Sequence, residues 1–212
     1  MKRSTSLSVI SISLAALAAI AIAALLVWHQ LGTAGASVDT SQNVGFRPAI
    51  EIGGPFSLVD HTGAKVTEES FSGKYMLITF GYTFCPDICP TGLTKMSSAL
   101  NKLGKNASKV QPIFVTVDPA RDTAKALSDY VTHFHPSFKG LTGNAEQIDK
   151  IAKAYRVLYR KAESGDSTEY LMDHTTFVYL MNPTGKLSMM FRYETDPADM
   201  ANAIAKEITG KS

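Results

Sequence analysis

The sequence predicts an α/β domain in which helices cover both faces of a mixed sheet, preceded by one transmembrane helix. Three observations lead to this prediction. Short apolar runs typical of strands alternate with longer periodic runs typical of helices, from residue 56 to residue 208. Residues 111–117 form a nearly continuous apolar run, as in a central parallel strand. An uncharged apolar run precedes this pattern, at residues 7–27.

The uncharged run at residues 7–27 is long enough to cross a bilayer as a helix, because about 1.5 Å per residue gives it a length of about 30 Å. Lys2 and Arg3 precede it, and the positive-inside bias therefore predicts a cytoplasmic N-terminus and export of the rest. Trp28 suits the membrane interface. In a bacterium these features predict a single-pass protein of the inner membrane, with its C-terminal domain in the periplasm, where disulfides persist.

We therefore expect a membrane anchor at residues 1–30, a flexible tether at residues 31–50 and a folded domain at residues 51–212. Residues 31–43 are rich in Gly, Ala, Ser and Thr, as flexible linkers are. A cleaved signal peptide is the alternative, because residues 34–36 (AGA) resemble a cleavage site. The apolar run is longer than the roughly 7–15 residues of the apolar region of a signal peptide, which favours the anchor. Both alternatives place the domain on the same side of the membrane.

The first half of the domain is expected to contain a hairpin, a strand and a helix. Residues 56–59 and 64–67 are short strand-like runs that flank the turn sequence DHTG, which predicts an N-terminal β-hairpin. A third strand is expected at residues 75–80, followed by a turn. A helix is expected at residues 90–103, where Leu, Met, Leu and Leu recur on one side.

After the strand at residues 111–117, Asp122 or Thr123 can cap a helix that runs to about residue 134, and Asn144 can cap another at residues 145–155. A short strand is expected between them. The remaining elements are then an inserted hairpin, two antiparallel strands and a last helix that begins with Pro in its first turn. The inserted hairpin is expected at residues 157–160 and 170–172. The two antiparallel strands are expected at residues 175–181 and 187–193, and the last helix at residues 197–208. This order of elements is a thioredoxin-like layout.

The two cysteines of the chain, Cys85 and Cys89, lie in the turn between the third strand and the first helix of the domain. Pro90 suits the first position of a helix and disfavours the helical conformation at the residue before it, so we expect Cys89 to be the helix N-cap. A helix N-terminus lowers the pKa of a thiol. A loop this short does little to stabilise a fold through a disulfide. The pair therefore suits a reversible disulfide or a thiophilic metal.

A histidine could complete a metal site, because imidazole binds both states of copper whereas thiolates favour Cu(I). His174 stands at the start of an apolar strand, in a region that thioredoxin-like folds place beside the active turn. The alternative is a strand-initiating histidine beside a capping Asp173. Asp173 or Asp87 could orient the imidazole or add charge, and a solvated turn carboxylate is the alternative for each.

The other four histidines are less suited to this role. We expect His29 at the membrane face, His61 solvated in a hairpin turn, and His133 with His135 at the end of a helix.

The balance of charge argues against nucleic acid as a partner. The 21 basic residues include Lys2 and Arg3, the only charged residues before residue 37, which leaves 19 against 19 acidic residues in the rest of the chain.

Three segments together, residues 81–90 (GYTFCPDICP), 117–123 (VDPARDT) and 173–176 (DHTT), resemble the Sco/SenC family. The resemblance implies a thioredoxin-like fold on a single membrane anchor. It also implies that Cys85, Cys89 and His174 bind copper as Cu(I) and Cu(II). One departure is Phe84, where many relatives carry His. That position is not one of the family's three ligands, and Phe makes the rim of the site more apolar.

The resemblance further implies a role in assembling the dinuclear copper centre of cytochrome c oxidase subunit II. Copper delivery to subunit II or another copper-receiving protein, thiol reduction of the target cysteines, or both would serve that role. The protein would then need a periplasmic copper donor and a thiol reductant, because a Cys85–Cys89 disulfide blocks loading. A metallochaperone is not an enzyme, whereas a thiol-disulfide reductase is.

Three other functions compete with copper delivery. A membrane-anchored thiol-disulfide reductase would use the same two thiols, although its usual motif is C-x-x-C. A thiol peroxidase shares the layout, but Thr83 is two residues before Cys85 rather than three, and the one tryptophan, Trp28, lies by the membrane. A copper or redox sensor would have the same site and differ only in its partner.

Overall fold

The computed structural model describes residues 20–28, 44–162 and 170–210, and the chain divides into two compact units, Met1–Thr40 and Ser41–Ser212. In the first unit a helix runs over residues 20–28. No helix within the described residues is both long and apolar enough to cross a membrane. The predicted transmembrane helix is therefore not found in this part of the chain, and residues 7–19 of it lie outside the described residues.

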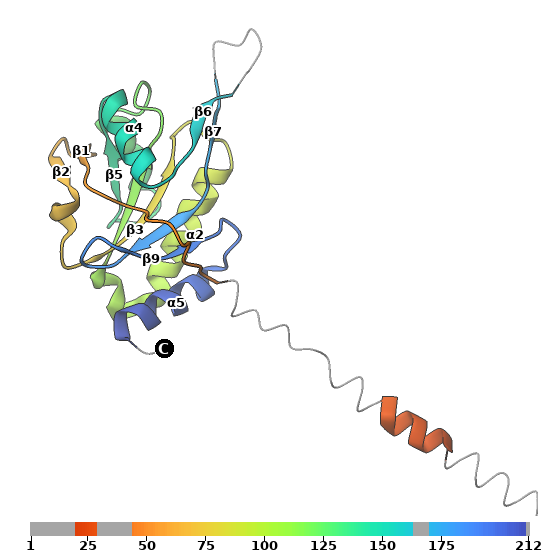
Figure 1. The fold of residues 1–212 in the computed structure, drawn as a ribbon. Coiled ribbons are helices and arrows are strands. Elements are labelled where there is room, and N and C mark those ends of the chain that lie inside the picture. The colour runs from red at the N-terminus through yellow and green to blue at the C-terminus, as the bar shows by residue number, and fades with distance from the viewer. Residues whose placement is uncertain (1–19, 29–43, 163–169, 211–212) are drawn as a thin grey trace, which may run out of the picture. The chain divides into compact units, whose positions relative to one another are not determined.

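The second unit is built on a seven-stranded mixed sheet with the strand order β2-β1-β5-β4-β3-β8-β9 (Figure 1). Its strands are β1 Ser57–Asp60, β2 Lys65–Thr67, β3 Tyr75–Gly81, β4 Val110–Thr116, β5 Lys139–Thr142, β8 Val178–Met181 and β9 Leu187–Phe191. Strands β3, β4 and β5 are parallel to one another, and the other neighbours are antiparallel. The predicted N-terminal hairpin, β1–β2, and the predicted mixed sheet are both confirmed.

Four α-helices cover this sheet: α2 Ile88–Leu103, α3 Ala124–Val131, α4 Ala145–Ala154 and α5 Pro197–Thr209. The domain also contains two short 3₁₀-helices that were not expected from the sequence, η2 Glu68–Phe71 and η3 Gly104–Lys109. The Phe114 ring of β4 packs on Tyr130 of α3, and α2 packs against α5. The Phe80 ring of β3 packs on Tyr155, at the end of α4.

The faces of the sheet follow from the alternation of side chains along a strand. A Cβ on Gly81 would lie 2.7 Å from Cys89 Sγ of α2 and 2.8 Å from the Phe114 ring. Positions 81 and 114 therefore face α2 and α3, whereas Phe80 faces the opposite side and α4. Helices lie on both faces of the sheet, as predicted, and the second unit has the thioredoxin-like layout.

The inserted hairpin is confirmed as a separate antiparallel pair, β6 Tyr159–Lys161 and β7 Met172–His174. Its tip, residues 163–169, lies outside the described residues. The predicted strand at residues 175–181 is shorter than expected, and β8 begins only at Val178. The reason is that His174 pairs with Tyr159, and Thr175 N–H still donates to Leu158 O at 3.0 Å, so this segment belongs to the hairpin before it joins the main sheet.

Part of the predicted tether contacts the domain. Phe46 and Met190 of β9 exchange two backbone hydrogen bonds, of 3.0 and 2.8 Å. The Phe46 ring also packs edge-to-face on Phe177, with 5.6 Å between the centroids. Residues 44–50 therefore lie within the second unit, and residues 31–43 of the predicted tether are outside the described residues.

Candidate metal centre

The cysteine turn joins the carboxyl end of β3 to the first turn of α2. Asp87 is the N-cap of α2, and Cys89 is the second residue of the helix. The prediction that Cys89 is the N-cap was therefore wrong. The helix can begin two residues before Pro90 because the first backbone N–H groups of a helix have no partner within it, so a proline at the third position loses no hydrogen bond. Cys85 lies in the turn, with its N–H donating to Tyr82 O at 3.2 Å.

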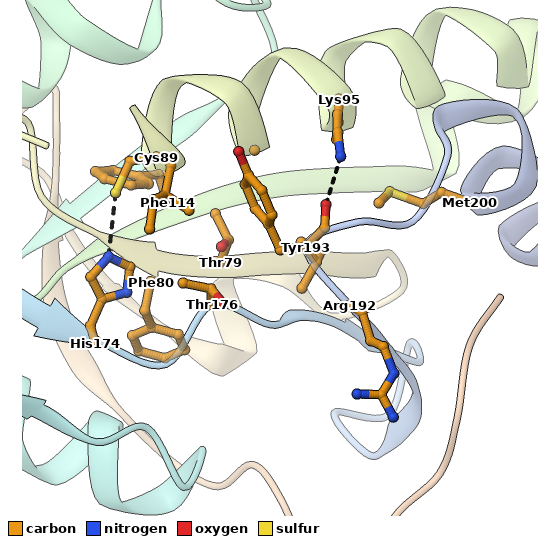
Figure 2. A pocket seen from close by; sticks show the side chains of 13 residues that line it. Thr79, Phe80, Cys89, Lys95, Phe114, His174, Thr176, Arg192, Tyr193 and Met200 are labelled. Atoms are coloured by element: carbon orange, nitrogen blue, oxygen red, sulfur yellow. Dashed lines mark hydrogen bonds between the residues drawn. The ribbon is translucent and has the colours of Figure 1, made fainter. Parts of the chain in front are cut away.

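The structure brings Cys85, Cys89 and His174 together, with their ligand atoms all within 4.8 Å of one another. The Cys89 Sγ atom lies 3.4 Å from His174 Nε2 (Figure 2). Both thiols are free and buried, whereas the imidazole is half-buried. A set of two sulfurs and one imidazole nitrogen fits copper, because thiolates favour Cu(I) and imidazole accepts either oxidation state.

The two thiols have opposite acidities. The neighbouring Cys89 thiol lowers the pKa of Cys85 far below its ordinary value, and the backbone N–H groups of Cys89 and Asp87 lower it further, whereas burial opposes them. The Cys89 N–H lies 3.4 Å from Cys85 Sγ. The Cys85 thiolate raises the pKa of Cys89, and burial raises it further. The pair therefore holds one negative charge near neutral pH, on Cys85, and the second proton stays on Cys89.

The His174 ring is oriented by its own strand. Its Nδ1 lies 3.0 Å from Thr175 O, and a carbonyl oxygen only accepts, so Nδ1 carries the proton. The lone pair is then on Nε2, the nitrogen that faces the thiols. The Tyr82 ring packs edge-to-face on the imidazole, with 6.0 Å between the centroids, and is itself buried. His174 therefore presents a metal-binding nitrogen to the site.

The two carboxylates that we expected near the imidazole lie elsewhere. The Asp173 carboxylate accepts from Arg160 Nε at 3.1 Å, and both side chains are exposed. The side chain of Asp87 is exposed, and its Oδ1 lies 3.4 Å from Thr91 Oγ1. Asp87 acts on the site through its backbone N–H, which lowers the pKa of Cys85. Backbone carbonyl Thr175 O, rather than either carboxylate, holds the imidazole.

The remaining histidines are not part of this cluster. His61 is not merely solvated, as predicted, because its Nδ1 accepts from the Gly140 N–H at 3.2 Å. His133 and the Ser137-bonded His135 lie beyond the C-terminal end of α3. His29 is outside the described residues. Among the described residues, Cys85, Cys89 and His174 form the one group of three such side chains that could hold a metal ion.

A buried carboxylate that the sequence did not predict lies behind the cysteine turn. Asp122, expected only as a possible helix cap, is fully buried and accepts hydrogen bonds from Thr83 N, Thr83 Oγ1 and Thr116 Oγ1, at 3.0, 2.6 and 2.6 Å. Burial raises the pKa of Asp122, and these hydrogen bonds oppose the rise. Thr123 is the actual cap of α3. Parallel strands end at the same edge of a sheet, and this rule could have placed the loop after β4 beside the cysteine turn.

A pocket opens beside the two candidate ligands Cys89 and His174 (Figure 2). Its walls are mostly apolar, with Phe80, Phe114 and Met200 among them. The site is therefore a small cleft rather than a closed core cluster, and the imidazole is accessible from it.

Comparisons with known proteins agree with this architecture. The family model described as SCO1/SenC matches residues 45–209. The Arabidopsis thaliana protein named SCO1 homolog 1, mitochondrial, is 43% identical over 158 residues, which are 74% of this chain and 47% of that relative. This chain therefore spans about half the length of that relative. The SCO2-like protein RP587 of Rickettsia prowazekii is 35% identical over 189 residues, which are 89% of this chain and 92% of the relative.

Solved structures show the same fold. The structure of Arabidopsis thaliana ScoI with copper bound has a TM-score of 0.71 and 42% identity, and covers 75% of this chain and 99% of its own. The structure of Bradyrhizobium japonicum ScoI with copper bound has a TM-score of 0.68 and 42% identity, and the match covers 73% of this chain and 98% of that one. BsSco is described as a member of the Sco family of cytochrome c oxidase assembly proteins, with a disulfide switch. Its structure has a TM-score of 0.62 and 26% identity, and the match covers 78% of this chain and 98% of that one.

The fold and the cluster define a thioredoxin-like protein with a site of two thiols and one imidazole. The chain belongs to the SCO1/SenC family. The resemblance stated from the three sequence segments is thereby confirmed.

Proposed function

We propose that this protein carries copper on Cys85, Cys89 and His174 and delivers it for the assembly of the dinuclear copper centre of cytochrome c oxidase subunit II. The observation that carries the proposal is the convergence of two thiols and an imidazole nitrogen within 4.8 Å. The structures of two relatives, each 42% identical to this chain, have copper bound. Another relative is described as belonging to the oxidase assembly proteins.

The acidities of the thiols suit a carrier that loads and unloads copper. Cys85 supplies a thiolate at neutral pH, because its pKa is lowered. Cys89 must lose its proton when copper binds, because its pKa is raised, so loading releases one proton. His174 then completes the coordination through Nε2, which needs no deprotonation. A recipient with its own cysteine thiolates could take the copper by ligand exchange at the open cleft beside Cys89 and His174.

The test is copper binding by the purified, reduced chain and three variants. Metal analysis after anaerobic Cu(I) loading should give one tightly bound copper per chain, and Cys85→Ser should abolish it. His174→Ala should weaken Cu(II) binding by about tenfold or more and Cu(I) binding much less, because Cu(II) favours nitrogen. His135→Ala, which removes an imidazole away from the site, serves as the control. If copper affinity falls equally little in His174→Ala and in His135→Ala, His174 is not a ligand of the site.

A thiol-disulfide reductase is the second candidate function. A low-pKa thiol beside a second thiol is the arrangement that reductases use, and the 26% identical relative BsSco is described as having a disulfide switch. In this role the Cys85 thiolate attacks a disulfide of the copper-receiving protein, and Cys89 then releases the product as the Cys85–Cys89 disulfide forms. A chain that cycles between dithiol and disulfide, and binds no copper tightly, would favour this function over delivery.

The compartment is part of the same proposal. We propose that residues 7–27 anchor the chain in a bacterial inner membrane, with the N-terminus in the cytoplasm and the copper domain in the periplasm. The uncharged run, preceded by Lys2 and Arg3, supports it. Treating spheroplasts with an added protease should degrade the domain while the cytoplasmic proteins survive. A domain that stays intact until the cells are lysed would contradict this topology.

A further inference from the structure

The loop at residues 117–123, the second of the three family-like segments, lies outside the proposed ligand set, yet it contacts both segments that carry the ligands. One of its contacts is to the cysteine turn, through Asp122 and Thr83. The other is to the hairpin that carries His174, through Asp118 and Tyr170. Cys89 and His174 are 85 residues apart in sequence, so something other than chain connectivity must set their distance.

The contact to the hairpin is a compact cluster of a carboxylate, a guanidinium and a phenol. The Tyr170 hydroxyl donates to Asp118 Oδ1 at 2.8 Å. The Arg121 guanidinium pairs with the same carboxylate and stacks on the Tyr170 ring, 3.7 Å from its centroid. The ammonium of Lys161, on the neighbouring strand β6, lies 4.1 Å from the same centroid. Asp118 is buried, so its hydrogen bonds are shielded from water.

The pleat of β7 links this cluster to the imidazole. Met172 and His174 share one face of β7, because side chains alternate along a strand. Tyr170 precedes the strand, and it faces the same way because buried or half-buried side chains alternate with exposed ones along residues 170–174. Met172 is buried on that face, whereas Leu171 and Asp173 are exposed on the other. Tyr170 is four residues before His174. Its anchoring on Asp118 therefore fixes the face of the hairpin from which the imidazole points toward the thiols.

The contact to the cysteine turn uses a second carboxylate, and Arg121 of the first cluster adds to it, because its guanidinium lies 4.6 Å from the centroid of the Phe84 ring. The Asp122 carboxylate accepts from the N–H and the hydroxyl of Thr83, two residues before Cys85, and from the Thr116 hydroxyl at the end of β4. The Thr142 hydroxyl of β5 donates to Asp122 O at 2.8 Å. Asp122 thus fixes the start of the cysteine turn to the parallel strands of the sheet.

We infer that the loop at residues 117–123 is a positioning element with two arms. In the first arm, Tyr170 on Asp118 and Arg121 sets the position of His174. In the second arm, Thr83 on Asp122 sets the position of the thiols. None of these five residues touches the metal in this inference. Loss of the first arm should affect nitrogen ligation, and loss of the second should affect sulfur ligation. The inference rests on the proposed copper site, whose partners outside the ligand set typically contribute about 10–100-fold to affinity.

The test compares Tyr170→Phe and Thr83→Ala with the matched control Tyr75→Phe. The Tyr75 hydroxyl donates to Glu207 O at 3.0 Å, on α5, and its loss removes a similar hydrogen bond elsewhere. We expect Tyr170→Phe to weaken Cu(II) binding about tenfold, to change the Cu(II) absorption and electron paramagnetic resonance spectra, and to change Cu(I) affinity by less than about twofold. We expect Thr83→Ala to weaken Cu(I) and Cu(II) binding alike, and Thr83→Ser to restore both.

Hydrogen exchange of the copper-free chain gives a readout that does not depend on copper. We expect faster exchange at the Thr175 amide, which donates to Leu158 O, in Tyr170→Phe, with no change there in Tyr75→Phe. Cu(II) affinity and exchange equal to those of the control would overturn the inference, and so would equal losses of Cu(I) and Cu(II) binding in Tyr170→Phe. A wild-type chain that binds no copper would sink the proposed function, and the exchange measurement would then decide the two-arm inference alone.

Discussion

At the scale of single residues, the central feature is the unequal acidity of two thiols that lie in one turn. The pKa of Cys85 is lowered, chiefly by the Cys89 thiol, and that of Cys89 is raised, chiefly by the Cys85 thiolate. A group with a lowered pKa keeps its charge as the pH falls below its ordinary pKa, which is about 8.5 for cysteine. The copper-free wild-type chain should therefore retain about one thiolate per molecule well below pH 7.

Replacing Cys89, whose thiol lowers the pKa of Cys85, should reverse part of that shift. In Cys89→Ala the pKa of Cys85 should rise, because its largest stabilising interaction is gone, although the backbone N–H groups of residues 87 and 89 still lower it. The ultraviolet absorbance of the thiolate, followed against pH, should show its midpoint at a higher pH than in the wild type. Cys85→Ala should show almost no thiolate at pH 7, because burial keeps the Cys89 proton on. Full absorbance in Cys85→Ala would mean that Cys89 holds the charge.

Residue-scale reasoning from sequence identified the ligand candidates but not their surroundings. Two cysteines four residues apart and a histidine at the start of a strand are visible in the sequence. The role of Thr175 O at the imidazole is not, since a backbone carbonyl belongs to every residue. Nor is the burial of Asp122, because an Asp before a helix predicts an N-cap equally well.

At the scale of elements, the site depends on how closely α2 approaches β3. A Cβ at position 81 would lie 2.7 Å from Cys89 Sγ and 2.8 Å from the Phe114 ring, both closer than real Cβ contacts. Glycine at the end of β3 therefore gives the helix room to place its sulfur beside the strand. The phenylalanine is fully buried and cannot move away without disturbing the core.

Gly81→Ala should displace the Cys89 sulfur and lower the free energy of unfolding by about 1–3 kcal/mol, because overpacking a core has costs of this order. Copper affinity should fall with it. Chemical denaturation and Cu(I) competition would measure the two effects. Gly92→Ala is the matched control, because a Cβ there meets no heavy atom within 4 Å, and alanine should stabilise α2 by up to about 1 kcal/mol. Wild-type affinity in Gly81→Ala would show that α2 shifts without harm to the site.

The elements themselves followed from periodicity, and their ends did not. The four helices and the two hairpins were predicted near their observed positions, because apolar spacing differs between helices and strands. The start of α2 was placed two residues late, since Pro90 suits several positions in a first turn. The segment after His174 was assigned to a long strand, because an apolar run does not indicate which of two partners it pairs with.

At the scale of the whole molecule, copper should stabilise the fold, because the complete ligand set exists only in the folded chain. A ligand at about 100 times its dissociation constant adds about 2.7 kcal/mol to the free energy of unfolding. For a domain of this size, that raises Tm by about 5–10 °C. Calorimetry of the reduced chain with Cu(I) should show a shift of this order, and Cys85→Ser should lose it.

The variant His174→Ala tests how much of the copper-induced Tm shift depends on the ligand that joins the site only in the folded chain. The unfolded chain keeps Cys85 and Cys89 four residues apart, so it also binds Cu(I), which reduces the shift. His174 is 85 residues from Cys89 and joins them only after folding. The Tm shift caused by Cu(II), which favours nitrogen, should therefore fall more in His174→Ala than the shift caused by Cu(I). Equal reductions for both ions would contradict a role for His174 that depends on the oxidation state.

The sequence by itself determined the layout and the ligand candidates. Alternating periodicities predicted helices on both faces of a mixed sheet, and the spacing of Cys85 and Cys89 predicted a pair that shares one turn, because each of these properties is local to a short segment. Three short segments were enough to indicate the family, which the comparisons confirm.

Only the tertiary structure decided how the pieces meet. It placed His174 Nε2 at 3.4 Å from Cys89 Sγ, assigned the charge to Cys85, and put the loop at residues 117–123 against both Thr83 and Tyr170. Distances between atoms, burial and the pKa shifts that follow from them depend on residues brought together from distant parts of the chain. Local sequence patterns do not record that packing, and so the order of the elements could be predicted whereas the electrostatics of the site could not.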